Sequence, residues 1–361
     1  MYQSQLILIF LTSVVVAVFA TWHIILFARK RDIYDQPNER KLHTKKISNL
    51  GGVGVFMASM FAYFAFSDIN IYPRPDTLFS ITIILFFIGL KDDLEPVKPF
   101  KRLAYEVLCA IFIIYFTDIS INSLFGIFNI HELPIWASYI ITVLFVVACI
   151  NAYNMIDGID GLIASLSLLG STLFGLMFLS AGEYLWAMLC VSISGALIGF
   201  LIYNWHPARI FMGNGGSMFL GTFFACACLR FMQLNVISHS FFDGSIRLTI
   251  LMPHTIALSV IAVPIFDLLS VFVIRLLNKQ SPFNADKRHT HHRLLDIGCS
   301  HWLATIVIVL ANVAIIVFAY FVQDTGALRS LLYTILFCTV LQLLLFGAHW
   351  RWFAKKQASS K

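Results

Sequence analysis

Charged residues are scarce in this chain of 361 residues. Asp, Glu, Lys and Arg make up 12% of it, whereas hydrophobic residues make up 59%. A soluble globular domain carries about 25% charged residues, so the composition excludes that class and indicates a polytopic membrane protein. We therefore expect a lipid bilayer around the chain and no nucleic acid among its partners.

Paired cysteines are also lacking. The seven cysteines lie mostly within hydrophobic stretches, and their spacing matches neither a disulfide framework nor a cysteine-based zinc site. Internal repeats and low-complexity segments are not apparent. We expect a single membrane-embedded domain over residues 1–350, followed by a short basic cytoplasmic tail over residues 351–361.

Eleven hydrophobic stretches approach the length of roughly 20 residues that a helix needs to cross a bilayer. They predict an all-α fold of about 11 transmembrane helices. The first stretch is too long for a cleaved signal peptide and lacks an early basic region, so we interpret it as a retained helix. The predicted spans cover residues 5–28, 51–67, 77–90, 103–117, 134–150, 162–181, 184–203, 217–236, 248–274, 302–322 and 328–349.

The positions of the 25 Lys and Arg residues predict the orientation. Most of them fall in alternate connecting segments, within residues 29–46, 91–102, 275–293 and 351–361. Because cytoplasmic loops retain positive charge, we expect the N-terminus outside and the C-terminus in the cytoplasm. Three polar clusters in the sequence then share the cytoplasmic face.

The first cluster is Asp92-Asp93, which follows the hydrophobic residues 81–90 and precedes Pro96 and Pro99. Prolines end a helix, so the two carboxylates are expected at a helix end. Acids there oppose the helix dipole, which favours a functional role such as binding a divalent metal or deprotonating a phosphate nucleophile. A solvated pair of loop acids is the alternative.

The second cluster, over residues 151–162, is the strongest local signal. Asn151, Asn154 and Asp157 recur at a spacing of three, which stacks them on one face of a helical turn. Amide and carboxylate oxygens are the hard ligands that Mg²⁺ prefers. Glycines follow Asp157 and Asp160 and let the backbone turn closely around a ligand. Helix capping is the alternative, but it requires only one Asp.

A glycine-rich turn over residues 213–217 leads into the next predicted span. Consecutive backbone amides at a helix N-terminus form a cradle for phosphate, and we expect that role here. Ser217 acting only as a helix N-cap is the alternative.

The third cluster is Arg288-His289-Thr290-His291-His292. Three histidines within four residues suggest zinc, but no cysteine lies beside them and the acids elsewhere favour a hard ion. We therefore expect imidazole N–H groups and the Arg288 guanidinium to bind the phosphates of a nucleotide. Zinc binding and a surface tract without function are the alternatives.

Together these motifs resemble those of the polyprenyl-phosphate N-acetylhexosamine-1-phosphate transferases, which share a fold with the muramoyl-pentapeptide phosphotransferase of peptidoglycan synthesis. The resemblance implies transfer of a sugar-1-phosphate from a UDP-sugar to undecaprenyl phosphate in the bacterial inner membrane, with Mg²⁺ required, Mn²⁺ as a substitute, and UMP released. The matching motifs are, in order, Arg40 to His43 with Gly51-Gly52, Asp92-Asp93, residues 151–162, Phe211 to Gly221, Pro264-x-x-Asp267 and Ser281 to Leu294.

The resemblance also implies roles for single residues. Asp92 and Asp93 would serve the acceptor phosphate, one of them as its base, with Arg102 beside them. Asn154 and Asn214 would bind the metal ion. The UDP-sugar would contact Asp157, Asp160, Asn204, Arg288, His289, His291 and His292.

Asn214 departs from the family pattern, in which the glycine turn usually carries a metal-binding Asp. An amide oxygen can still ligate Mg²⁺ but contributes no charge, so the affinity should fall unless a neighbour such as Asp157 compensates. A natural variant, an inactive relative and a substitution that traps a complex all agree with this sequence.

The His289 to His292 arrangement resembles the N-acetylhexosamine branch, so we expect UDP-GlcNAc as the donor, with UDP-FucNAc or UDP-QuiNAc as alternatives. A transporter is an alternative of another class, but it would place ionisable groups near mid-span. Here the acids gather at one face, apart from a few such as Glu106 and Asp267. A non-catalytic lipid-binding or scaffold protein is a further alternative, and a homo-oligomer is compatible with the sequence.

Overall fold

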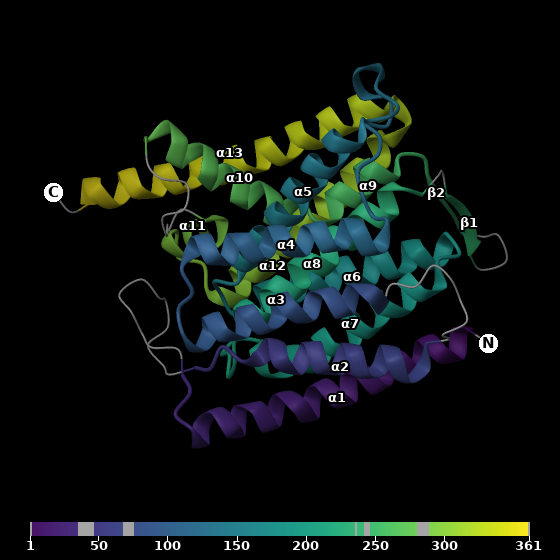
Figure 1. Cartoon of the computed structure of the whole chain (residues 1–361). Helices are drawn as coiled ribbons and strands as arrows, with labels where there is room; N and C mark the ends of the chain where they lie inside the picture. The colour runs from purple at the N-terminus through teal and green to yellow at the C-terminus, as the bar shows by residue number, and fades with distance from the viewer. Residues whose placement is uncertain are drawn as a thin grey trace.

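The computed structural model describes residues 2–34, 47–67, 76–234, 237–241, 246–279 and 289–359. Helices occupy all eleven predicted spans, so the all-α polytopic class is confirmed (Figure 1). The helices are α1 (Tyr2–Lys30), α2 (Gly51–Phe66), α3 (Asp76–Leu94), α4 (Pro99–Thr117), α5 (Ile135–Ile156), α6 (Leu162–Ser180), α7 (Tyr184–Asn204), α8 (Gly213–Met232), α9 (Pro253–Val260), α10 (Ala262–Leu277), α11 (Thr290–Asp296), α12 (His301–Val322) and α13 (Ala327–Ser359).

Fewer helices meet the length and apolarity of a membrane crossing than the structure contains. Among the described residues, seven helices are long and apolar enough to cross a membrane, and the bent pair α9–α10 would make eight. Helix α2 is apolar but has only 16 residues, while α3 and α4 carry charged residues within their bounds. Eleven crossings and the cytoplasmic orientation therefore stay predictions.

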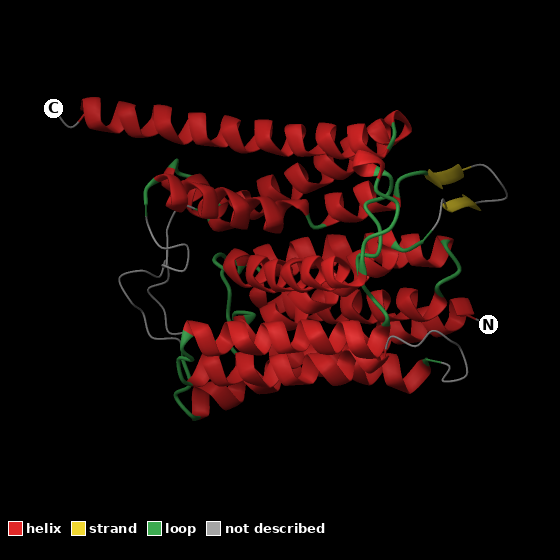
Figure 2. Ribbon diagram, turned by 45° about the horizontal axis from the view of Figure 1, so that its top comes forward, coloured by secondary structure: helices red, strands yellow, loops and turns green. Residues whose placement is uncertain are grey.

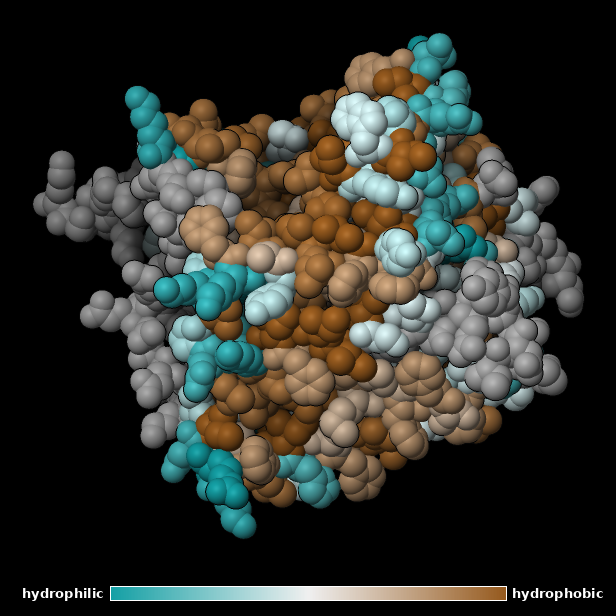
Figure 3. All heavy atoms as spheres, viewed as in Figure 1, coloured by the Kyte–Doolittle hydropathy of each residue, from teal (hydrophilic) through white to brown (hydrophobic). Residues whose placement is uncertain are grey.

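The surface agrees with a membrane protein. In the space-filling view, hydrophobic residues cover the middle of the molecule and hydrophilic residues gather toward its left and right ends (Figure 3). Many of the exposed side chains are large and apolar, including Phe19, Phe87, Tyr115 and Leu144. The two termini lie at opposite ends of the helical bundle (Figure 1).

Two details differ from the expected spans. Residues Ile237–Phe241 and Ile246–Ile250 form an antiparallel hairpin, β1–β2, at the end of the bundle opposite the C-terminus (Figure 2). Its β-branched Ile and Thr residues favour a strand over the helix predicted to begin at residue 248. Helix α13 also continues to Ser359, through residues predicted as a tail.

Helix α8 is the centre of the fold, with nearly every side chain buried between α3, α5, α2, α9 and α6. Glycines permit this close packing, because small residues let helix backbones approach one another in a membrane. A Cβ on Gly52 would overlap the backbone of Gly216, and a Cβ on Gly89 would lie 2.6 Å from the Asn214 carbonyl oxygen. The start of α8 is thus wedged between α2 and α3.

Candidate active site

The predicted polar clusters meet at one end of the bundle. The C-terminal ends of α3 and α5, the N-terminus of α8 and helix α11 all lie toward the left in Figure 1. Hydrogen bonds join Asp93 to Asn214, Asp157 to Gly213 and Asn154 to Asn214, across 121, 56 and 60 positions of sequence. Three segments that are distant in the chain therefore form one site.

The glycine-rich turn binds carboxylates of the protein itself. Gly213, which has φ of +72°, donates its N–H to Asp157 Oδ2 at 3.1 Å. The next two amides, of Asn214 and Gly215, donate to Asp93 Oδ1 and Oδ2 at 2.8 and 3.1 Å. Because the helix N-terminus attracts any anion, these internal carboxylates occupy it. The prediction that the same amides cradle a phosphate stays a prediction, which would require these carboxylates to move away.

The Asn154 amide connects α5 to α8. Its Nδ2 donates to Asn214 Oδ1 at 2.6 Å and to Ser217 Oγ at 2.8 Å. The two amide groups that were predicted as metal ligands are therefore neighbours. Asn151, one turn earlier, instead donates to Glu106 on α4, so the two asparagines face different helices.

The Asp157 carboxyl has an unusual charge environment. Burial raises its pKa, the nearby Asp93 carboxylate adds to the rise, and the N–H of Gly213 acts in the opposite direction, so that the pKa is raised to about 7. Two carboxylates beside two amide oxygens are a donor set that suits a hard divalent cation.

This pKa has a consequence for stability. Between pH 3.8 and about 7 the folded chain holds the Asp157 proton that the unfolded chain has released. The resulting stabilisation is complete below pH 3.8 and is lost as the pH rises toward 7. In the absence of divalent cations, we expect the melting temperature to fall over this interval more for the natural chain than for Asp157→Asn. Equal slopes in thermal scans at several pH values would contradict the raised pKa.

Arg102 lies between two acids. Its Nε bonds to Glu106 Oε1 at 3.0 Å, and its Nη1 lies 3.6 Å from Asp92 Oδ2. The buried Glu106 carboxylate also accepts from Asn151 Nδ2 at 2.5 Å. Asp92 Oδ1 accepts from the N–H of Val97 at 2.7 Å. The predicted pairing of Arg102 with Asp92 is therefore present, and Glu106 holds the guanidinium in place.

The histidine cluster packs against the second polar cluster. His289 Nδ1 lies 2.7 Å from Asp267 Oδ2, and the N–H of Thr290 donates to Asp267 Oδ1 at 2.7 Å. The buried His291 ring lies so close to Gly158 that a Cβ there would overlap its Nε2. The ring of His292 lies 4.4 Å from that of His291. Arg288 lies outside the described residues.

Burial keeps His291 uncharged. Burial and the neighbouring His292 lower the pKa of the imidazole, against an opposite effect of the Asp267 carboxylate, so that the pKa falls to about 3. A neutral imidazole still offers one N–H donor. Its Nδ1 is buried and has no hydrogen-bond partner within the part of the chain that the structure describes.

Asp160 and Asn204 are engaged with the protein itself. Asn204 accepts from the N–H of Gly161 and donates to the Ile210 carbonyl oxygen, which holds the 161 and 210 segments together. Asp160 Oδ2 lies 2.7 Å from His206 Nδ1 and accepts from the N–H of Ala208. Their predicted contact with a nucleotide stays a prediction.

Sequence reasoning gave no site role to several of these residues. Glu106, His206 and His301 belong to none of the predicted motifs, and they contact Asn151 or Asp160, which lie far away in the chain. An acid in a membrane span was the only available signal, and it applied to Glu106 and Asp267. Both are paired, Glu106 with Arg102 and Asn151, and Asp267 with His289.

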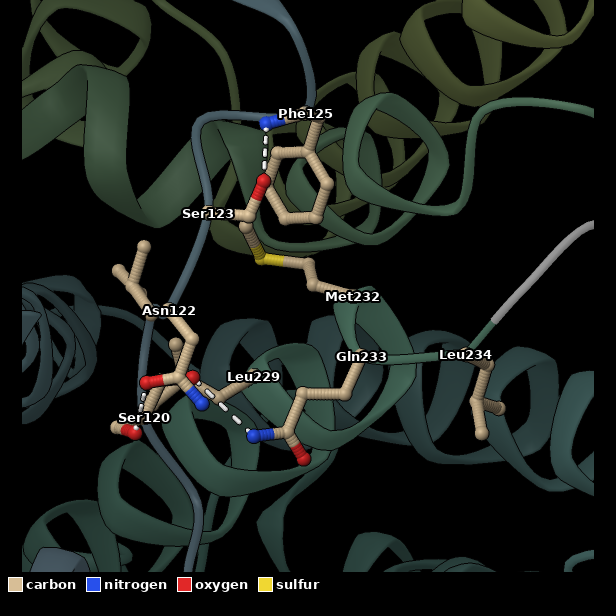
Figure 4. A pocket seen from close by; sticks show the side chains of 9 residues that line it. Ser120, Asn122, Ser123, Phe125, Leu229, Met232, Gln233 and Leu234 are labelled. Carbon is tan, nitrogen blue, oxygen red and sulfur yellow. Dashed lines mark hydrogen bonds between the residues drawn. The ribbon is translucent and has the colours of Figure 1, made fainter. Parts of the chain in front are cut away.

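A pocket of about 380 Å³ lies at the opposite end of α8. It is lined by residues 120–123 and Phe125, which follow α4, and by Leu229, Met232, Gln233 and Leu234 (Figure 4). Gln233 Nε2 donates to the Ser120 carbonyl oxygen across it. The 20 residues of α8 separate the pocket from the glycine turn by roughly 30 Å, so it is not part of the site.

Comparisons with known proteins agree with this geometry. Residues 77–232 match the model of glycosyl transferase family 4. The probable undecaprenyl-phosphate N-acetylglucosaminyl 1-phosphate transferase of Bacillus subtilis is 32% identical over 307 residues, which cover 85% of this chain and 82% of the relative. The undecaprenyl-phosphate alpha-N-acetylglucosaminyl 1-phosphate transferase of Thermotoga maritima is 30% identical over 279 residues, 77% of this chain and 78% of the relative.

The enzyme of that same name from Escherichia coli K12 is 29% identical over 315 residues, which cover 86% of this chain and 80% of the relative. These matches extend over nearly the whole helical bundle and include the α3, α5 and α8 ends that form the site. The chain therefore belongs to the polyprenyl-phosphate N-acetylhexosamine-1-phosphate transferases of glycosyl transferase family 4.

Proposed function

We propose that this protein transfers N-acetylhexosamine-1-phosphate, with GlcNAc-1-phosphate as the first choice, from a UDP-sugar to undecaprenyl phosphate and releases UMP. The observation that carries the proposal is the convergence of Asp93, Asp157, Asn154 and Asn214 on the glycine turn, at one end of an apolar bundle. The names of the relatives support the same reaction. The Lys and Arg distribution favours the cytoplasmic face of the bacterial inner membrane.

The acceptor phosphate fits beside Asp92 and Arg102. A guanidinium binds phosphate oxygens in a bidentate manner, and Arg102 is held for this by Glu106. Asp92 lies close enough to the same guanidinium to meet a phosphate bound there. Asp93 is already hydrogen-bonded to two backbone amides. Of the two acids, we therefore assign the role of base to Asp92.

The donor diphosphate fits on the other side of the glycine turn. Asn154, Asn214 and the carboxylates of Asp93 and Asp157 would hold Mg²⁺, or Mn²⁺ in its place, and the bound ion would supply charge neutralisation to the diphosphate. His291 and His292, whose rings lie side by side, would donate N–H groups to the phosphates, and the His291 Nδ1 has no hydrogen-bond partner among the described residues. In support of this, Asp157 precedes Gly158 in the chain and the His291 ring lies against Gly158.

UMP release by the purified protein tests the reaction. Undecaprenyl phosphate, Mg²⁺ and one of UDP-GlcNAc, UDP-FucNAc or UDP-QuiNAc would be supplied in separate assays. We expect the highest kcat/KM with UDP-GlcNAc and no release without the lipid phosphate or after chelation of the metal. If only another UDP-sugar were turned over, the proposed donor would be wrong but the proposed reaction would stand. Failure with every donor would overturn the proposal.

Gly158 should be essential to the position of His291. In Gly158→Ala the new Cβ overlaps His291 Nε2, so the ring must move. A displacement of about 1 Å in a reacting geometry can cost 10²-fold, and we expect a loss in kcat/KM of that order. Gly347→Ala is the matched control, because nothing lies within 4 Å of the added Cβ. Wild-type kinetics in Gly158→Ala would show that His291 has no role at the donor phosphates.

A further inference from the structure

A second group of possible metal ligands lies next to the proposed site. Asp160, His206 and His301 each offer one ligand atom, and these atoms lie within 4.8 Å of one another. Asp160 follows α5, His206 lies between α7 and α8, and His301 is the first residue of α12. Among the described residues, no other set of three His, Cys, Asp or Glu side chains converges in this way.

We propose that Asp160, His206 and His301 form a binding site for Zn²⁺, separate from the Mg²⁺ site at the glycine turn. Two imidazole nitrogens and one carboxylate oxygen are a ligand set that zinc accepts, with water in the fourth position. The site at the glycine turn offers only amide and carboxylate oxygens, which suit a hard ion. The two sites therefore differ in chemistry.

The ligand atoms of the three residues lie within 4.8 Å of one another, close enough for one ion after small adjustments of the side chains. Bonds of about 2.0–2.1 Å place tetrahedral ligand atoms roughly 3.3 Å apart. Asp160 Oδ2 lies 2.7 Å from His206 Nδ1, and Asp160 Oδ1 lies 3.5 Å from His301 Nδ1. Small side-chain rotations would admit the ion. On binding, His206 would carry its proton on the other ring nitrogen, because the nitrogen that meets the metal must offer its lone pair.

Surrounding groups orient the ligands, as is usual around metal sites. The N–H of Ala208 donates to Asp160 Oδ2 at 3.1 Å, and Thr305 Oγ1 on α12 donates to the Asp160 carbonyl oxygen at 3.0 Å. Asp160 is buried, whereas His206 is 40% exposed, so an ion can enter from the surface. Zinc would thus join three segments that otherwise meet through hydrogen bonds. This inference rests on the geometry and not on the proposed reaction.

Zinc binding by the full-length protein in detergent is the test. Equilibrium dialysis after chelator treatment, with Mg²⁺ in excess to occupy the hard-ligand site, should find one Zn²⁺ per chain. The melting temperature should rise by several degrees on binding, because the ion binds only the folded state. Co²⁺ in place of zinc should give the visible bands of a tetrahedral nitrogen and oxygen site.

Single variants locate the ion. His206→Ala and His301→Ala should each weaken Zn²⁺ binding at least about 100-fold, because loss of a direct ligand exceeds the 10- to 100-fold cost of losing a supporting group. His301→Cys should restore Zn²⁺ binding, since thiolate is a zinc ligand. His23→Ala, on α1 and outside the cluster, is the control.

Two results would overturn the proposal. One is the absence of zinc binding by the natural chain. The other is zinc binding that survives in both His206→Ala and His301→Ala and disappears in His292→Ala, which would place the ion in the α11 histidine cluster.

Discussion

The Asp92→Asn variant should lose about 10²- to 10⁴-fold in kcat for UMP release, the usual contribution of a positioned general base. The amide cannot take a proton from the acceptor phosphate. Its oxygen can still accept the bond from the N–H of Val97, and its loss of charge leaves Arg102 paired with Glu106. The variant should therefore keep its melting temperature while it loses turnover.

Asp93→Asn should differ from Asp92→Asn in its effect on the melting temperature. Asp93 accepts from two consecutive amides at the start of α8, whereas an asparagine would turn its NH₂ group toward one of them. An unsatisfied buried donor costs about 1–3 kcal/mol, so this variant should have a lower melting temperature as well as lower activity. Loss of turnover in Asp93→Asn alone, with Asp92→Asn active, would reverse the roles that we assign to the two acids.

Most of the architecture could be predicted because membrane helices leave a strong hydropathy signal. The eleven regions of helix follow from the length of the apolar runs, and the placement of the polar clusters at span ends brings them to one end of the bundle. The number of membrane crossings could not be predicted from hydropathy in the same way. Helices α3 and α4 combine apolar runs with charged residues of the site. The 72° bend between α9 and α10 has no signal in the hydropathy.

Within the site, residue types were easier to predict than their partners. A spacing of three placed Asn151 and Asn154 on one helix, but it could not show that the first faces Glu106 and the second Asn214. The glycine turn offers amides to any anion, and only the fold shows that Asp93 and Asp157 occupy them. Local patterns cannot contain these contacts, because each joins residues that are more than 40 positions apart.

The second large effect is expected for Mg²⁺ binding when Asn214 is replaced by aspartate. In Asn214→Asp the new carboxylate can accept the same bond from Asn154 Nδ2, so the local structure should persist. It adds a third negative charge beside Asp93 and Asp157, whose mutual repulsion already raises the pKa of Asp157. Without a divalent cation this variant should therefore be less stable than the natural chain. With Mg²⁺ bound, the added charge should be favourable.

We expect the Mg²⁺ concentration for half-maximal UMP release to fall by about 10- to 100-fold in Asn214→Asp, equivalent to about 1.4–2.8 kcal/mol of binding free energy. This is less than the roughly 4 kcal/mol of a close charge pair in a medium of dielectric constant near 20, because the carboxylate must also lose its water. Calorimetric titration of Mg²⁺ measures the same change without turnover. Asn122→Asp, at the opposite end of the bundle, controls for the added charge.

Turnover of the natural chain beside Asn214→Asp also shows whether a chain with asparagine at position 214 is an active enzyme. Turnover in both forms, with weaker Mg²⁺ binding in the natural chain, would show that Asp93 and Asp157 compensate for the missing carboxylate. Turnover only in Asn214→Asp would show that the natural chain is a disabled member of its family, even though its fold and substrate contacts are intact. An unchanged Mg²⁺ titration would contradict the assignment of Asn214 as a ligand, since a new charge in direct contact with the ion cannot leave its affinity unaltered.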